Sequence, residues 1–303
     1  MRLIFAGTPE PARVVLEKLS EQHEIALVLS RPDAIAGRDR NAKESEVAAF
    51  ARSRGWPVLK SNKLEEPELE LIASVEAEMA VVVAYGVLLP PEALRLLPWW
   101  NLHFSELPSW RGAAPLQYSL IHQRGQGFTI FQLDQGLDTG PIVESVALSL
   151  PNDKPAGELL MELANEGAER LLHNLSSSHA LVPQSGEKSY APRISRSDAR
   201  IDFKLLASEI QRRVYAFNPE PMSWCKAKDS DLRILSARAI GDVDWNLVSS
   251  EQIGSGEVLL DAGRVIVGCG NGTRLELVQV QPAGGRIMNA SDWYRGFKGT
   301  KLD

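Results

Sequence analysis

The sequence predicts an α/β fold: a Rossmann-like, doubly wound and mostly parallel sheet, followed by a small C-terminal β-barrel of the OB-like kind. Three observations predict it. Short apolar runs alternate with amphipathic helical stretches over the first part of the chain. The run Met79–Tyr85 is apolar throughout, as a strand buried on both faces is. The last third of the chain holds short strand-like segments separated by glycine-bearing turns.

The elements of the N-terminal part follow from the spacing of their apolar residues. A strand over Arg2–Ala6 turns at Gly7 into a helix that reaches Ser20, and Pro11 suits the first helical turn because an N–H has no helical acceptor there. The other expected strands are Glu24–Ser30, Met79–Tyr85, Trp99–Ser105 and Phe128–Asp134. The other expected helices are Val47–Arg54, Ala113–Gln123 and Gly157–Leu175.

The C-terminal part is expected to hold one helix, Lys204–Phe217, and a set of short strands. The strands are Met222–Ala227, Leu232–Ala239, Glu257–Leu260, Arg264–Cys269 and Leu275–Gln281. Their turns favour a small antiparallel barrel. A polar, proline-containing stretch precedes the helix, so we expect an α/β domain over 1–178, a linker over 179–202 and a barrel domain over 203–303.

Composition excludes several classes of protein. The chain has 303 residues, of which 44% are hydrophobic and 24% charged, and this excludes a disordered tail, a collagen-like fibre and a disulfide scaffold. Cys225 and Cys269 have no metal-ligand spacing. No apolar run has the length of a membrane span, and no signal peptide is visible. We therefore expect a cytoplasmic protein that does not associate with membranes, and no signal demands more than a monomer.

Charge is unevenly distributed along the chain. The net charge is −6, yet residues 188–238 hold 11 basic and 6 acidic side chains. A polyanion would be attracted to that stretch and repelled by the acidic first part of the chain. A solvated helix face and linker explain the same excess, and charge alone favours this simpler interpretation.

The turn after the first strand argues against a nicotinamide cofactor. Dinucleotide binding needs the pattern G-x-G-x-x-G at this place. Here Pro9 replaces the second glycine and lacks a donor N–H, while Glu10 would repel a phosphate at the helix N-terminus. The fold class by itself would favour an oxidoreductase, and these two residues disfavour it.

Asn101 and His103 are the first candidates for a reactive site. They occupy positions i and i+2 of an expected strand and so project to one face. Both lie near the carboxyl end of that strand, where open α/β sheets bind their ligands. An imidazole and a carboxamide on one face suit a carbonyl carbon that becomes tetrahedral. A buried histidine bonded to the backbone is the alternative, and it is favoured for such a short motif taken alone.

Two neighbouring loops complete the candidate site. Asp138 lies in the glycine-rich turn after the strand that ends at Asp134, which we interpret as a strand-end cap. A carboxylate facing His103 would fix its tautomer and raise its pKa. The loop Ser105–Pro115 follows the Asn-x-His motif directly, and its prolines and small residues favour a rigid wall that holds a planar ligand through backbone groups. A buried wall without ligand is the alternative.

Together these motifs resemble the folate-dependent formyltransferase family. The resemblance rests on Asn101-x-His103, Ser105-x-Leu107-Pro108-x-Trp110-Arg111-Gly112 and Leu137–Gly140. It extends over nearly the whole chain through Phe5–Glu10, Val81–Pro90, Tyr190–Ile194, Asp198–Asp202, Ala216–Pro219 and Gln281–Gly285. The C-terminal matches favour the branch that acts on aminoacyl-tRNA over relatives that act on ribonucleotides or sugars.

The resemblance implies a defined reaction. The formyl group of 10-formyltetrahydrofolate would pass to the α-amine of methionine on initiator tRNA, for translation initiation, without a metal and without a nicotinamide. Asn101 would hydrogen-bond the formyl oxygen as it becomes an oxyanion. His103 would share that role and pass a proton to the departing N10. Asp138 would orient His103 and help to take the proton from the attacking ammonium.

The resemblance also implies where the substrates bind. The implied folate contacts are Ser105, Glu106, Leu107 and Pro108 in one loop and Val83, Tyr85, Gly86 and Val87 in another. The implied tRNA contacts are Arg38, Arg40 and Lys43, with the barrel and the linker following the tRNA backbone. Glu106 stands where the family usually has leucine, so we expect its side chain to face water.

Three other functions remain open on the sequence. An enzyme of the same family could use water or a nucleotide sugar as the formyl acceptor. A tRNA-binding module without catalysis would make His103 dispensable. A nicotinamide oxidoreductase is disfavoured by Pro9, and measurable binding of the cofactor would revive it.

Overall fold

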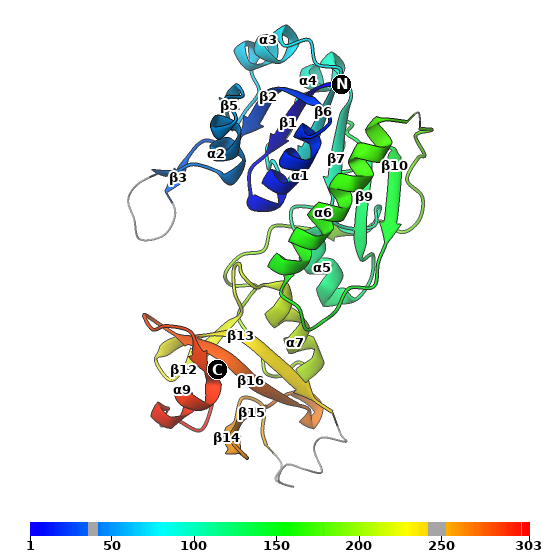
Figure 1. Ribbon diagram of the computed structural model, residues 1–303. Helices are drawn as coiled ribbons and strands as arrows, with labels where there is room; N and C mark the ends of the chain where they lie inside the picture. Colours follow the sequence, from blue (N-terminus) through cyan, green and yellow to red (C-terminus); the bar gives the residue numbers. More distant parts are fainter. Residues whose placement is uncertain (36–41, 178, 242–252, 298) are drawn as a thin grey trace. The chain divides into compact units, whose positions relative to one another are not determined.

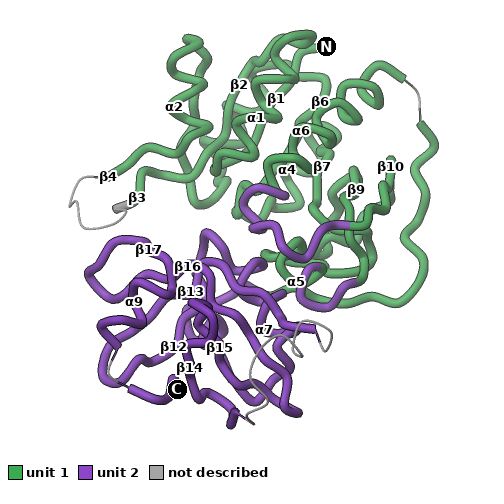
Figure 2. The backbone as a smooth tube through the Cα atoms, turned by 60° about the horizontal axis from the view of Figure 1, so that its bottom comes forward, with its two compact units in different colours: residues 1–119, 124–149, 160–192 green, residues 120–123, 150–159, 193–303 purple. Residues whose placement is uncertain are grey.

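The computed structural model describes residues 1–35, 42–177, 179–241, 253–297 and 299–303. Contacts divide the chain into two compact units (Figure 2). Unit 1 consists of Met1–Ser119, Arg124–Ser149 and Leu160–Pro192, and unit 2 of Leu120–Gln123, Leu150–Leu159 and Arg193–Asp303.

A seven-stranded sheet forms the centre of unit 1 (Figure 1). Its strand order is β10-β9-β7-β6-β1-β2-β5. The strands are β1 (Arg2–Gly7), β2 (Glu24–Ser30), β5 (Val58–Lys60), β6 (Met79–Val83), β7 (Trp99–His103), β9 (Gly127–Gln132) and β10 (Ile142–Ala147). The five strands from β5 to β7 are parallel, β9 is antiparallel to β7, and β10 is antiparallel to β9. The expected mostly parallel sheet is confirmed.

Helices cover both faces of this sheet. One face carries α1 (Glu10–Ser20), α2 (Glu46–Ser53) and α6 (Ala156–Leu175), and the other carries α3 (Glu66–Ser74) and α4 (Pro91–Leu96). On the α3 side, Ile72 and Ala93 pack with Trp99 of β7 in one buried cluster. On the opposite side, Leu102 of β7 packs against Gly167 of α6, where an added Cβ would lie 2.6 Å from Leu102 Cδ2. Successive residues of β7 thus face different layers.

Unit 2 is built on an antiparallel sheet. Its strand order is β12-β13-β16-β15-β14, with β17 pairing β16. The strands are β12 (Trp224–Ala227), β13 (Ser230–Ile240), β14 (Val258–Asp261), β15 (Arg264–Gly268), β16 (Arg274–Pro282) and β17 (Met288–Asn289). The helix α7 (Ala207–Ala216) buries Ile210 and Val214 in the core of this sheet, against which Trp293 and Phe297, in and just after α9 (Ala290–Gly296), also pack.

Residues 300–303 join the two ends of the antiparallel sheet. Lys226 N, in β12, donates to Asp303 O at 2.6 Å, and Val258 N, in β14, donates to Thr300 O at 2.9 Å. Leu302 belongs to this segment and is 1% exposed within the unit 2 core. The segment therefore closes the curved sheet, which confirms the expected OB-like form.

Replacing Leu302 by alanine should lower the free energy of unfolding by about 2–5 kcal/mol, because it leaves a cavity at the closure of the barrel. Chemical denaturation of the whole chain measures it. Leu260→Ala is the matched control, since Leu260 is 47% exposed in β14, and its effect should stay within about 0.5 kcal/mol. Equal effects of the two variants would show that Leu302 does not anchor the closure.

The expected linker is hydrogen-bonded to both units rather than free. Residues 179–192 belong to unit 1, where Val182 and Ile142 exchange two backbone hydrogen bonds of 2.7 and 2.9 Å. In the same unit β11 (Tyr190–Ala191) pairs in parallel with β8 (Arg111–Gly112). Residues 193–202 belong to unit 2, where Ile201 N donates to Trp224 O at 2.8 Å. The amino-acid composition of this stretch does not indicate these long-range backbone hydrogen bonds. The domain boundaries at 178 and 203 stay a prediction.

Candidate active site

Strand β7 places Asn101 and His103 on one face of the sheet, near its carboxyl end. Asn101 pairs directly with Phe131 of the antiparallel strand β9. The His103 ring meets the same Phe131 edge-on, with ring centroids 6.2 Å apart and an interplanar angle of 89°. Asn101 is half-buried and His103 is 5% exposed. The spacing of the two residues on a strand therefore gives the common face that was expected.

His103 is held by a backbone carbonyl. Its Nε2 lies 3.0 Å from Trp110 O, and because a carbonyl oxygen only accepts, Nε2 carries the hydrogen. Nδ1 then holds the lone pair of the neutral ring and lies 3.8 Å from Asp138 Oδ2. Burial lowers the pKa of His103 below its ordinary value of 6.5, although Asp138 and the Trp110 carbonyl both raise it. Asp138 therefore raises the pKa of His103 as expected, but burial outweighs it, so the net shift is downward and the ring is neutral at pH 7.

Asp138 lies in the turn after β9 and is fixed by hydrogen bonds. Its Oδ2 accepts from Gly112 N at 2.7 Å, and its backbone has a φ of 50°, in the left-handed region. Asp134 caps the same turn, because its Oδ1 accepts from Gly136 N at 2.9 Å and from Thr139 Oγ1 at 2.5 Å. A carboxylate bonded on one side to a backbone N–H thus faces the lone pair of His103.

Three consecutive residues, Trp110 to Gly112, make hydrogen bonds that fix the side chains of the site. Trp110 supplies the carbonyl that holds His103, and Gly112 supplies the N–H that holds the Asp138 carboxylate. Between them, Arg111 donates from Nη2 to Gln184 Oε1 at 2.6 Å. The backbone of β8 is itself fixed by β11, and at Gly112, with φ 129°, an added Cβ would lie 2.6 Å from Ala191 O. Only glycine fits this approach without displacing β11.

Comparison with known proteins gives the family. Residues 1–175 match the family model described as formyl transferase, and residues 193–298 match the model of its C-terminal domain. The chain belongs to the formyl transferase family. The family resemblance derived from the motifs is therefore confirmed, and the protein is an enzyme of this class.

Individual relatives of this formyl transferase agree with the family match. The methionyl-tRNA formyltransferase of Acidothermus cellulolyticus is 43% identical, over 98% of this chain and 97% of its own length. The solved methionyl-tRNA formyltransferase from Clostridium thermocellum has a TM-score of 0.59 at 17% identity, over 80% of this chain and 94% of that one. HypX from Aquifex aeolicus, solved with tetrahydrofolic acid, has a TM-score of 0.64 at 15% identity over 100% of this chain. This chain spans about half of HypX (48%), and both structural matches show the fold alone.

The loop after β7 in this formyl transferase is held by its own buried side chains. Ser105 is fully buried and donates to Ser109 O at 2.7 Å, and Leu107 is buried with its N–H donating to Thr129 Oγ1 at 3.0 Å. Glu106 is exposed, as expected, and Pro108 is half-buried. Of the four residues expected to contact folate here, Glu106 and Pro108 are therefore accessible, whereas Ser105 and Leu107 are buried and their N–H groups are already bonded.

The loop after β6 divides in the same way. Val83 and Tyr85 are buried, and burial raises the pKa of the Tyr85 hydroxyl to about 12. Gly86 is exposed with a φ of 74°, and Val87 is half-buried. A ligand at the carboxyl ends of the strands would therefore meet Gly86 and Val87, whereas Val83 and Tyr85 are buried.

The residues expected to contact tRNA are described only in part. Arg38 and Arg40 lie outside the described residues. Lys43 is exposed in β4 (Ala42–Lys43), which pairs with β3 (Ala34–Ile35), and its Nζ lies 2.9 Å from Glu46 Oε1. The three residues are therefore not brought together by anything the structure shows.

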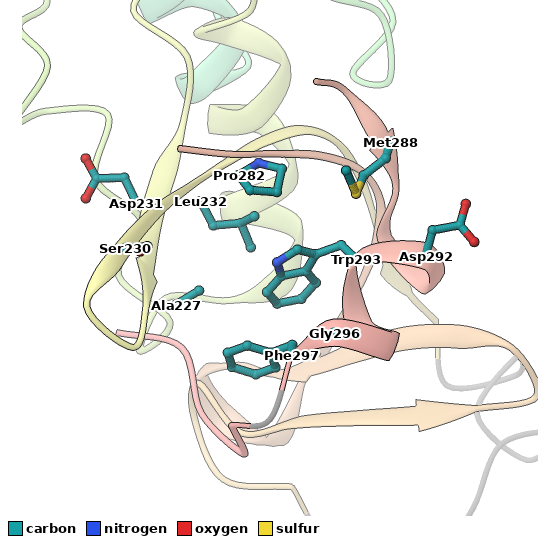
Figure 3. Close-up of a pocket in the computed structure, with 10 residues that line it drawn as sticks. All are labelled: Ala227, Ser230, Asp231, Leu232, Pro282, Met288, Asp292, Trp293, Gly296 and Phe297. Carbon is teal, nitrogen blue, oxygen red and sulfur yellow. The ribbon is translucent and has the colours of Figure 1, made fainter. Parts of the chain in front are cut away.

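Among the described residues, two cavities are lined by unit 2 side chains and by none of Asn101, His103 and Asp138. The first, of about 350 Å³, is lined by the stacked rings of Trp293 and Phe297 together with Met288 and Pro282 (Figure 3). The second, of about 600 Å³, is lined by residues that include Tyr215 and Asn218. In the described part of the chain, no group of three His, Cys, Asp or Glu side chains has the arrangement of a metal site. None of its helices has the length and hydropathy needed to span a membrane.

Sequence reasoning missed Gln184 as part of this site. The segment around it was expected to be a linker, and Gln184 lies 46 residues from Asp138 along the chain. The structure distinguishes Gln184 from its neighbours, because Gln184 is half-buried while Pro183 and Ser185 are exposed.

Proposed function

We propose that this formyl transferase passes the formyl group of 10-formyltetrahydrofolate to the α-amine of methionine on initiator tRNA. The observation that carries the proposal is the approach of Asp138 to the lone pair of a neutral His103, beside Asn101, in a chain that matches methionyl-tRNA formyltransferases over nearly its whole length. The matching C-terminal domain favours a tRNA acceptor over a nucleotide sugar.

In the proposed mechanism the bound folate supplies an activated one-carbon unit. The Asn101 carboxamide donates a hydrogen bond to the formyl oxygen as negative charge develops there. His103 is neutral, so its Nδ1 accepts the proton that the amine loses as the new N–C bond forms. Asp138 stabilises the imidazolium produced, at 3.8 Å. His103 then returns the proton to N10 as the C–N10 bond breaks, so that protons and bonds balance.

Binding of the two substrates is proposed on separate grounds. The exposed residues Glu106 and Gly86 and the partly exposed Pro108 and Val87 border the carboxyl ends of β7 and β6, and these loops would receive the folate. Arg38, Arg40 and Lys43, with the basic stretch 188–238 and the barrel, would contact the tRNA phosphates. The protein is proposed to act as a monomer in the cytoplasm.

A transfer assay tests the proposed function. Purified protein, 10-formyltetrahydrofolate and charged initiator tRNA should yield formylmethionyl-tRNA, measured by acid gel electrophoresis or by mass spectrometry of the released amino acid. Uncharged tRNA and a nucleotide amino sugar serve as alternative acceptors and should remain unmodified. Release of formate without transfer, or formylation of the sugar alone, would reject a tRNA acceptor.

A further inference from the structure

We propose that Gln184 is a positioning residue of the formyl transfer site and that it acts by holding the backbone of the Asp138 turn. This role rests on the proposed function, because Gln184 reaches the reacting atoms only through Asp138 and His103. The expected signature is a loss in turnover that disappears when Asp138 no longer carries a charge.

The Gln184 carboxamide uses both ends of its side chain. Its Nε2 donates to Asp138 O at 2.9 Å and to Gly140 O at 2.8 Å, which occupies both amide hydrogens. Its Oε1 accepts from Arg111 Nη2 at 2.6 Å. One side chain therefore links two carbonyls of the Asp138 turn to the strand β8.

The Asp138 turn needs such a link. Residues 133–141 belong to no helix or strand, so the carbonyls of Asp138 and Gly140 have no partner within a regular hydrogen-bond ladder. Asp138 also has a φ of 50°, in the left-handed region that is uncommon for residues other than glycine. Gly140 fixes the end of the turn, since an added Cβ would lie 1.8 Å from Gln132 O. The two bonds from Gln184 hold the turn at the residue that bears the carboxylate.

The bonds form a closed circuit with the site. Arg111 holds Gln184, Gln184 holds the Asp138 backbone, and the Asp138 carboxylate accepts from Gly112, the neighbour of Arg111. Without the Gln184 bonds, Asp138 stays attached at its carboxylate while its backbone is released. The separation of 3.8 Å between Asp138 Oδ2 and His103 Nδ1 is then no longer fixed.

Two substitutions of Gln184 test this role. Gln184→Met keeps the length of the side chain and removes every hydrogen bond, and Gln184→Glu keeps the Arg111 contact but loses both donors to the turn. Each should lower kcat at least about tenfold with KM for both substrates little changed, since misplacement of a reacting group costs turnover. Gln135→Met, an exposed position in the same turn, is the matched control and should behave as wild type.

A double-variant cycle separates positioning from a general structural role. In an Asp138→Asn background, Gln184→Met should cause no further loss of kcat, because the charge that it positions is already absent. Losses that multiply in the double variant, or wild-type kcat in both Gln184 variants, would overturn the proposal. Should Gln184→Met not fold, Gln184→Glu is carried through the same cycle.

A measurement without substrate keeps this proposal apart from the proposed function. The His103 side chain is titrated by NMR in the ligand-free protein, where Asp138 is the charged group that raises the pKa of His103. Gln184→Met should lower that pKa in the same direction as Asp138→Asn, and Gln135→Met should leave it unchanged. An unchanged titration in Gln184→Met would overturn the positioning role even if transfer to tRNA is found. A lowered pKa would support it even if no transfer is found.

Discussion

Replacing His103 by alanine should lower kcat at least about a hundredfold, the scale expected when a general acid–base group is lost. The variant loses the group that both takes the proton from the amine and returns it to N10. The structure supports this double role because Nε2 is occupied by Trp110 O while Nδ1 keeps its lone pair. Single-turnover kinetics with saturating folate and charged tRNA measure the chemical step directly.

The pH dependence gives an independent check on His103. Because burial lowers the pKa of His103 below 6.5, the imidazole stays neutral in mildly acidic solution. Wild-type activity should therefore fall only below pH 6.5, which gives the pH profile an acid limb. His103→Ala should abolish this limb. His173→Ala, at an exposed position of α6, is the control and should keep both kcat and the limb. A fully active His103→Ala variant would remove the imidazole from the mechanism.

Asp138→Asn should also lower kcat at least about a hundredfold, and it separates charge from placement. The asparagine oxygen can still accept from Gly112 N, so the turn should keep its position while the negative charge near Nδ1 is lost. The imidazolium formed during transfer then has no counter-charge at 3.8 Å. The acid limb should move to lower pH, because the carboxylate raises the pKa of His103.

The matched control is Asp134→Asn, since Asp134 begins the same turn and its capping bonds can be made by an asparagine oxygen. That variant should retain nearly wild-type kcat and an unshifted limb. If Asp138→Asn keeps wild-type turnover, the hydrogen bond to Gly112, and not the charge, is what the site needs from Asp138.

The sequence predicted what depends on local periodicity. Asn101 and His103 could be assigned to one face because a strand alternates its side chains, and the fully apolar run from Met79 could be recognised as a buried strand. The weaker elements were missed. Most residues of β10 are partly exposed, so buried and exposed positions hardly alternate along it. α4 has only six residues and begins with a proline. Neither element therefore shows a clear hydrophobic period.

What the sequence could not predict depends on contacts between distant segments. The nearby carboxylate raises the pKa of His103, as expected, but the net shift is downward because of burial, whose extent only the packed structure gives. Gln184 carries no motif, and its partners lie 44, 46 and 73 residues away along the chain. A polar stretch with prolines therefore predicts a linker even where its backbone is hydrogen-bonded into a sheet.

The hydrogen bonds that Trp110 and Gly112 make to His103 and Asp138 limit which sequence changes this enzyme can tolerate. Both contacts are made by the main chain, through a carbonyl and an N–H, so a residue with another ring at position 110 still has the carbonyl that accepts from His103. Inserting or deleting a single residue in β8 should have a larger effect than replacing a side chain. It would shift the register by which β8 presents alternate groups, and the histidine and the aspartate would lose their anchors together. Variation in length at this point should be far more damaging than variation in side-chain identity.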